Sequence, residues 1–200
     1  MKRVITSVTV CAMLILLAGC GSGQAAKEPT PEDVVASAID AVKNCDFVTA
    51  NAAWGSDIQK EADAAMEDDQ EAVAKAMCSG IQYEIVSSDA AEDTATVTVK
   101  ISNKDLGNAF KDAMGEMFLE LMSNLGSDNQ MTEEESQQYF TDLFAEKINS
   151  GNYETVENTV DVALTKGENG WEISGDTEDA IDAMFGGLIS TASEIGEGFN

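Results

Sequence analysis

Apolar side chains recur every three to four residues in several stretches of the chain, a spacing typical of helices that bury one face. The pattern predicts helices over residues 31–43, 46–54, 57–77, 105–125 and 132–150, and a last one from about Thr177. Three of them have a residue that can cap the first turn, followed three residues later by an acid: Thr30 with Asp33, Ser102 with Asp105, and Thr132 with Glu135. These pairs predict where the helices begin.

Other stretches alternate apolar and polar residues with a period of two, which is the pattern of strands with one buried face. They run over residues 81–85, 94–101, 156–164 and 171–174. Because these strands come as two hairpins and not as strand-helix-strand units, we expect a four-stranded antiparallel sheet and an α+β class. The helix over 31–43, with its single apolar stripe, is the natural cover for the buried face of that sheet.

The segment between the two hairpins, about residues 104–150, is predicted to form an inserted helical hairpin. Its first helix carries a broad apolar face: Leu106, Phe110, Ala113, Met114, Met117, Phe118, Leu121 and Met122. Three methionines on this face, Met114, Met117 and Met122, could line an adaptable pocket, because methionine is flexible and polarisable. The alternative is that the stripe is ordinary hydrophobic core.

The N-terminus has a different pattern. Lys2 and Arg3 precede an uncharged apolar run over 4–18, which is shorter than the roughly 20 residues of a spanning helix and has the flanks of an export signal. Residues 17–20 (Leu-Ala-Gly-Cys) resemble the lipobox of bacterial lipoproteins, in which the signal is cut before the cysteine and the thiol carries a diacylglyceryl group. The resemblance implies that Cys20 anchors an extracytoplasmic domain to the membrane. The alternative is an ordinary cleaved signal with a coincidental cysteine.

The chain is therefore expected to have four parts. Residues 1–19 form the lipoprotein signal peptide, and residues 20–29 form the lipidated cysteine and a small, polar linker. Residues 30–190 form a single α+β domain that includes the helical insertion, and residues 191–200 form a frayed tail after the interruption at Gly186-Gly187.

The net charge of the chain restricts the kinds of partner that it can bind. The whole chain carries 11 basic and 37 acidic residues, and removal of the signal takes away Lys2 and Arg3, so the mature net charge is about −28. Such a charge excludes a general nucleic-acid binder, because contacts to phosphate need lysine and arginine. It also argues against docking on anionic lipid by charge, so the diacylglyceryl group on Cys20 must do the tethering.

The residue types restrict the chemistry as well. The chain has no histidine, which removes histidine-based nucleophilic sites and histidine-ligated zinc. Of the four cysteines, Cys45 and Cys78 remain in the exported domain, and we expect them to form a disulfide. Two buried free thiols are the alternative. We predict no metal site and no cofactor.

The order of elements resembles the small NTF2-like (cystatin-like) lipoproteins of Gram-positive bacteria. The resemblance lies in the capped helix over 31–43 followed by Asp46-Phe47, in the hairpin that ends Lys-Gly-Glu-Asn-Gly-Trp-Glu-Ile at 166–173, and in the segment 179–188. It implies N-terminal helices packed on a curved four-stranded sheet, and a lipid-anchored position on the extracytoplasmic face of a Gram-positive cell membrane. The helical insertion departs from the minimal form, and no family site residues can be placed on this sequence.

These observations favour a non-catalytic binding or envelope-interaction module with an unknown partner. A small-ligand binder that uses the interior of the cone or the methionine face is a second hypothesis. A carboxylate enzyme with Tyr83, Tyr139 or Tyr153 is a third. It is disfavoured because the inward positions of the predicted strands, 95–101 and 160–164 taken alternately, carry no acid.

Overall fold

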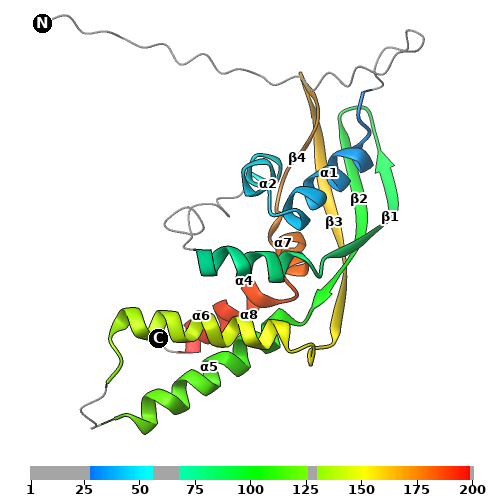
Figure 1. Ribbon diagram of the computed structural model, residues 1–200. Helices are drawn as coiled ribbons and strands as arrows, with labels where there is room; N and C mark the ends of the chain where they lie inside the picture. The colour runs from blue at the N-terminus through cyan, green and yellow to red at the C-terminus, as the bar shows by residue number, and fades with distance from the viewer. Residues whose placement is uncertain (1–27, 56–67, 126–129, 199–200) are drawn as a thin grey trace, which may run out of the picture.

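The structure is a computed structural model that describes residues 28–55, 68–125 and 130–198 (Figure 1). In these ranges the elements are α1 (Pro31–Lys43), α2 (Phe47–Trp54), α4 (Asp68–Cys78), β1 (Gln82–Ala90), β2 (Thr94–Lys104), α5 (Leu106–Ser123), α6 (Glu133–Asn149), β3 (Thr155–Gly167), β4 (Gly170–Ile173), α7 (Glu178–Met184) and α8 (Leu188–Gly198). Of the helix predicted over 57–77, residues 57–67 lie outside the described residues. The rest of the predicted helix pattern is present.

The strands form one four-stranded open sheet in the order β1-β2-β3-β4, and all three neighbouring pairs are antiparallel. The sequence prediction of two hairpins in an antiparallel α+β domain is therefore confirmed. The central pair is long, because β2 and β3 stay in register from Thr94↔Thr165 to Lys104↔Thr155. The edge strand β1 has a bulge between Ile85 and Ser87, and β4 is short, with only four residues.

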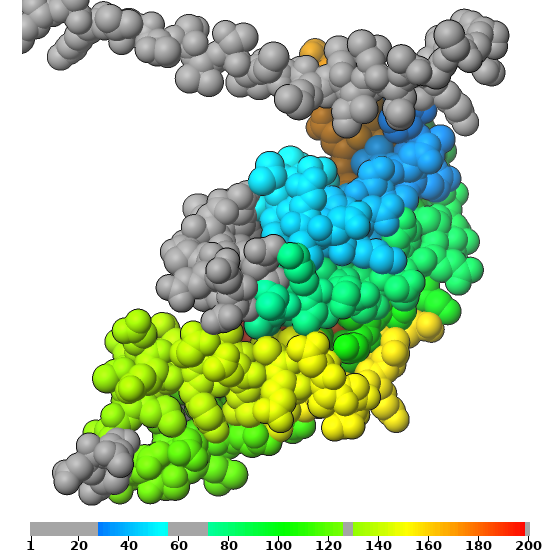
Figure 2. Space-filling view, in the orientation of Figure 1, coloured from blue at the N-terminus to red at the C-terminus, as the bar shows by residue number. Residues whose placement is uncertain are grey.

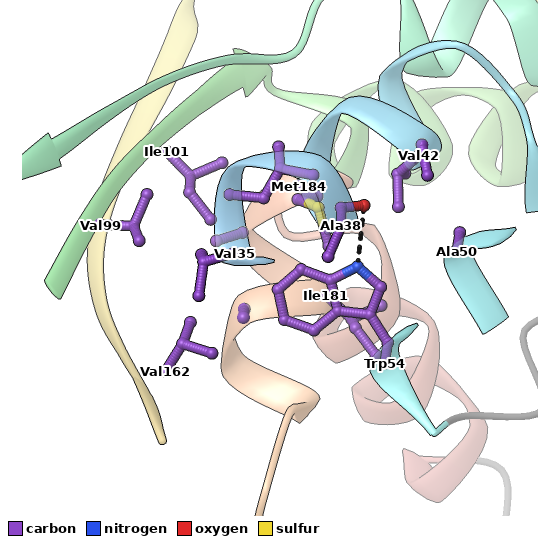
Figure 3. Close-up of a cluster of buried hydrophobic side chains, with 14 of the residues drawn as sticks. Val35, Ala38, Val42, Ala50, Trp54, Val99, Ile101, Val162, Ile181 and Met184 are labelled. Atoms are coloured by element: carbon purple, nitrogen blue, oxygen red, sulfur yellow. Dashed lines mark hydrogen bonds between the residues drawn. The ribbon is translucent and has the colours of Figure 1, made fainter. Parts of the chain in front are cut away.

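One face of the sheet is covered by α1, as predicted, and also by α7. Helix α1 packs against β1, β2 and β4, while α7 packs against β2 and β3. Figure 3 shows how Val35 and Ala38 of α1 and Ile181 and Met184 of α7 meet the inward side chains of the strands. The indole of Trp54 on α2 closes this cluster and donates a hydrogen bond from Nε1 to the carbonyl of Ala38 at 3.1 Å.

A second hydrophobic cluster holds the base of the inserted hairpin. Leu106, Ala109 and Ala113 of α5 are buried against Leu143, Phe144 and Ile148 of α6. The ring of Phe110 lies edge-on to Phe140 and Phe144, with centroids 5.5 Å and 5.9 Å away. Helix α4 packs on the other side of α6, and Met77 of α4 contacts both clusters. The insertion is therefore joined to the domain at its base.

Two of the three predicted caps are confirmed. Thr30 caps α1 and Thr132 caps α6, each in a reciprocal capping box with the acid three residues later. The prediction that Ser102 caps the helix at 105–125 is wrong. Strand β2 continues through Ser102 to Lys104, and Asp105 is the cap itself, since its Oδ1 accepts a hydrogen bond from the backbone N–H of Asn108 at 2.8 Å.

The expected frayed tail over 191–200 is also wrong for its described part. The chain turns at Gly186-Gly187 and forms α8 from Leu188 to Gly198. Oδ1 of Asp182 accepts hydrogen bonds from the backbone N–H groups of Ile189 and Ser190, both at 3.0 Å, and so caps the first turn. Helix α8 packs on α5, and Thr191 is buried there, so tertiary contacts hold this segment in place.

Candidate functional site

The chain enters the described domain at the turn between β3 and β4. The carboxylate of Glu28 lies 3.7 Å from the ammonium of Lys166, next to that turn. The inserted hairpin leaves β2 after Lys104 and returns to β3 at Thr155, which is the other end of the same strand pair. Strand β3 has 13 residues, so the two ends are roughly 40 Å apart along the sheet. Figures 1 and 2 show the hairpin projecting from the end of the domain that is remote from the start of α1.

Cys20, the predicted lipidation site, lies outside the described residues, as do the signal and most of the linker. Within the ranges that are described, the helices are all too short or too polar to cross a membrane. The described part of the chain begins at Glu28, which lies beside the β3–β4 turn at one end of the sheet.

Cys45 and Cys78 lie close together, as a disulfide would require. Cys45 has a left-handed backbone, with φ of 56°, in the turn between α1 and α2, and its side chain is half-buried. Cys78 is the last residue of α4 and is fully buried in the cluster under the sheet. Both are free thiols in the structure, and Cys45 is near enough to Cys78 to raise the pKa of its thiol. The structure brings the pair together, and its oxidation stays a prediction.

Burial raises the pKa of the Cys78 thiol above its ordinary value, and the neighbouring Cys45 raises it further. A thiol with a raised pKa is a poor nucleophile, because the thiolate is the reactive form. This environment is that of a structural cysteine and not of a catalytic one.

The three methionines predicted to line a pocket do not share one environment. Met114 and Met117 are half-buried on α5, whereas Met122 is 52% exposed further along the same helix. The apolar face of α5 is core only near its start. Phe118, Leu119, Leu121, Met122 and Leu125 are all exposed. The interpretation of the whole stripe as hydrophobic core is therefore wrong from Phe118 onward, while Met114 and Met117 are half-buried.

The tyrosines considered for catalysis have structural partners. The hydroxyl of Tyr153 donates to Oδ2 of Asp112 on α5 at 2.8 Å, and desolvation together with this bond raises the pKa of Tyr153 to about 12. Burial, and then the charge of Asp40, raises the pKa of Tyr83, whose hydroxyl lies 3.5 Å from the carbonyl of Ala36. Tyr139 is half-buried in the second cluster. Raised pKa values keep the first two as neutral donors, which does not suit a general base.

An additional ion pair lies beside Tyr153. The ammonium of Lys147 on α6 contacts the carboxylate of Glu116 on α5, and the hydrogen bond to that carboxylate raises the pKa of Lys147. This pair links α5 to α6, and the Tyr153–Asp112 bond links α5 to the segment that follows α6. Sequence reasoning did not identify this cluster, because its members are 31 to 41 residues apart in the chain.

Asn103 is a buried polar residue that sequence reasoning also missed. It follows the inward positions 95, 97, 99 and 101 of β2 by one more step of two, and only 1% of its surface is exposed. Its Nδ2 donates to the carbonyls of Met77 and Met184, and its Oδ1 accepts from the backbone N–H of Lys104. The alternation of inward and outward positions along β2 is the sequence signal that could have identified Asn103 as buried. Because every polar group of the side chain is satisfied within the protein, the residue ties β2 to α4 and α7 and presents nothing to a ligand.

Comparison with known proteins gives one distant likeness. No protein-family model matches the sequence, and no curated protein matches it either. Among solved structures, the chain is similar to the crystal structure of ycdA from Bacillus subtilis, a protein described as a candidate lipoprotein, with a TM-score of 0.40 and 16% sequence identity. The match covers 78% of this chain and 46% of ycdA, so the chain spans less than half of that protein.

Proposed function

We propose that this protein is a lipid-anchored extracytoplasmic lipoprotein whose α+β domain acts as a non-catalytic binding module. The observation that carries the proposal is the sequence Leu-Ala-Gly-Cys at 17–20, placed directly after a positively flanked apolar run. Two acyl chains on Cys20 would make a stable anchor, whereas a single chain is marginal.

The position of the linker supports a presenting role. The linker reaches the domain at Glu28, beside the β3–β4 turn, and the inserted hairpin projects from the other end of the sheet. A membrane attached through Cys20 would therefore lie near the turn and leave the hairpin directed away from the lipid. This arrangement suits a domain that holds a surface out to a partner in the envelope.

We infer further that the domain is of the NTF2-like type. What supports this is the pairing of α1 with a four-stranded antiparallel sheet, together with α7 on the same face. The hairpin of α5 and α6 between β2 and β3 is an addition to that form. It gives the protein a helical surface that a minimal domain of this type would lack.

The non-catalytic character of the proposal rests on the side chains themselves. The chain has no histidine, and the face of the sheet under α1 and α7 is lined by apolar side chains, Tyr83 and Asn103, whose polar atoms are all engaged. The bound hydroxyls of Tyr83 and Tyr153 have raised pKa values. Neither tyrosine is therefore prepared to accept a proton at neutral pH.

The anchor is tested with the substitution Cys20→Ser in the producing cell. The wild-type chain should be found in the membrane fraction and should take up labelled fatty acid, and the variant should lose both properties. Cys11→Ser is the matched control, because Cys11 lies inside the apolar run and should leave both properties unchanged. A Cys20→Ser chain that stays in the membrane fraction and is still acylated would refute the anchor.

A further inference from the structure

The inserted hairpin carries an apolar stripe that the rest of the described chain leaves uncovered. Phe118, Leu121 and Met122 follow one another at the spacing of a single helix face, and Leu125 lies two residues after the helix ends at Ser123. We call these four residues the α5 stripe. They are 60%, 39%, 52% and 68% exposed. Closer to the base, Phe110 packs edge-on against the rings of Phe140 and Phe144 on α6. The same helix is thus buried at its start and open toward its end.

The sequence of α6 explains why that helix does not cover the stripe. Its first six residues, 133–138 (Glu-Glu-Glu-Ser-Gln-Gln), are all polar, and the aromatic residues that meet α5 begin only with Tyr139 and Phe140. Figure 1 shows α5 and α6 closest together near the sheet and diverging away from it. The outer half of the hairpin therefore has one apolar arm, on α5, and one acidic arm, on α6.

The charge on this part of the chain has a single sign. Between Lys111 and Lys147 the sequence contains no lysine or arginine, although it contains several acids. Glu133 and Glu134 are exposed at the start of α6, while Glu135 is held in the capping box with Thr132. A binding partner must supply apolar side chains for the α5 stripe and positive charge for the acids of α6.

We propose that the α5 stripe and the acidic start of α6 bind a basic amphipathic helix of another protein. Such a helix lays its apolar face against a hydrophobic surface and places lysine or arginine at the rim. A second copy of this chain fits poorly, because two hairpins of the same negative sign would repel each other. Anionic lipid fits poorly for the same reason, and the linker enters at the other end of the sheet.

This inference rests on the proposed function, because it assigns the binding surface of the proposed binding module. Its test measures peptide affinity, which does not depend on whether Cys20 is lipidated. Binding by the hairpin requires the side chains of α5 and α6, whereas membrane attachment requires Cys20. A failure of one can therefore be separated from a failure of the other.

The test uses the lipidated chain in phosphatidylcholine nanodiscs and a synthetic peptide of leucine, alanine and lysine, whose leucines lie on one helix face. Affinity is measured by titration at physiological ionic strength, and empty nanodiscs provide the blank. The wild-type chain should bind this peptide, and should bind poorly a peptide of the same composition in scrambled order. The double variant Phe118→Ser/Leu125→Ser should weaken binding about tenfold or more.

Matched controls separate the stripe from general charge. Val48 on α2 is 68% exposed, like Leu125, so Val48→Ser should leave the affinity unchanged. Glu133→Gln/Glu134→Gln should weaken binding and reduce its dependence on salt, whereas Glu92→Gln/Glu168→Gln, at exposed acids outside the hairpin, should do neither.

Several results would overturn the proposal. One is equal affinity of the double stripe variant and the wild type, and another is equal binding of the scrambled peptide. A dimer of the lipid-free Cys20→Ser chain that the stripe substitutions dissociate would make a second copy the occupant. Flotation of that chain with anionic vesicles in a stripe-dependent manner would make the occupant a membrane. In all of these outcomes the anchor test on Cys20 keeps its own result.

Discussion

The side-chain amide of Asn103 on β2 donates a hydrogen bond to the carbonyl of Met184, the last residue of α7, at 2.7 Å. The same amide group donates to the carbonyl of Met77 on α4 at 3.0 Å. One buried side chain thus joins the sheet to two helices that are far apart in the sequence. It lies close to the point where β2 ends and the inserted hairpin begins.

We expect Asn103→Ala to lower the free energy of unfolding by about 3 kcal/mol, because it leaves buried carbonyls without a donor. Urea denaturation followed by circular dichroism measures the change. Asn158→Ala, at an exposed asparagine of β3, is the control and should change stability by less than about 0.5 kcal/mol. Equal effects of the two substitutions would show that the Asn103 bonds are not important for stability.

Gly186 is required where α7 turns into α8. Its φ is +56°, and a Cβ there would lie 2.0 Å from the carbonyl oxygen of Lys104. Gly151 has a similar φ of +71° but open space around it. Gly186→Ala should therefore destabilise the protein by about 3 kcal/mol or more, and Gly151→Ala by only about 1 kcal/mol, the cost of the left-handed backbone alone. Thermal unfolding of both variants compares them directly, and similar losses would contradict the close approach to Lys104.

The pairing of Cys45 with Cys78 predicts a disulfide in the protein purified from an oxidising compartment. Intact mass of the unreduced chain should be lower by two hydrogens, and both thiols should become alkylated only after reduction. Reduction should lower the free energy of unfolding by about 3 kcal/mol, because the bridge closes a loop of about 34 residues. In Cys45→Ser, the buried Cys78 should be alkylated only when the chain is unfolded.

Ready alkylation of both residues in the unfolded, unreduced wild-type chain would contradict the disulfide. It would leave the two as free thiols, with Cys78 buried and Cys45 half-buried, which is the state that the structure shows.

The bond between Tyr153 and Asp112 predicts a dependence on alkaline pH. The pKa of Tyr153 is raised to about 12 in the folded protein, so the neutral phenol is favoured over the tyrosinate. The contribution of this group to stability is therefore fully present below its ordinary pKa of about 10, and is lost as the pH rises through the folded value. Asp112→Asn should lower the pKa of Tyr153 toward the ordinary value.

Tyrosinate absorbance during an alkaline titration measures this shift, since the chain contains three tyrosines. Asp161→Asn is the control, because the Asp161 carboxylate accepts from Thr98 and not from a tyrosine. If the high-pH part of the titration does not move in Asp112→Asn, then Asp112 does not set the pKa of Tyr153.

Much of the fold follows from local patterns. Thr30 with Asp33 and Thr132 with Glu135 predict the starts of α1 and α6, because a capping box needs only neighbours in the chain. The alternation from Ala95 to Ile101 predicts which side of β2 is buried. These patterns depend only on residues close together in the chain, so the sequence alone predicts them correctly.

The sequence predictions are wrong where the structure depends on contacts between residues far apart in the chain. Helix α8 is held by Asp182 and by α5, and neither contact is visible in its own sequence. Ser102 has the residue type of a cap but lies in a strand that pairs with Glu157 of β3. The apolar face of α5 looks uniform in the sequence, yet α6 covers only its first half. Opposite the second half, the residues of α6 are polar. The uncovered part of α5 is the α5 stripe, which we propose as a binding surface.

The central claim is that Cys20 carries the lipid that holds this domain at the membrane. Mass spectrometry of the N-terminal tryptic peptide of the mature protein, residues 20–27, tests it most directly. We predict a peptide that begins at Cys20 and carries a diacylglyceryl group on its sulfur. A mature chain that begins at any other residue, or an unmodified Cys20 at its start, would contradict the claim.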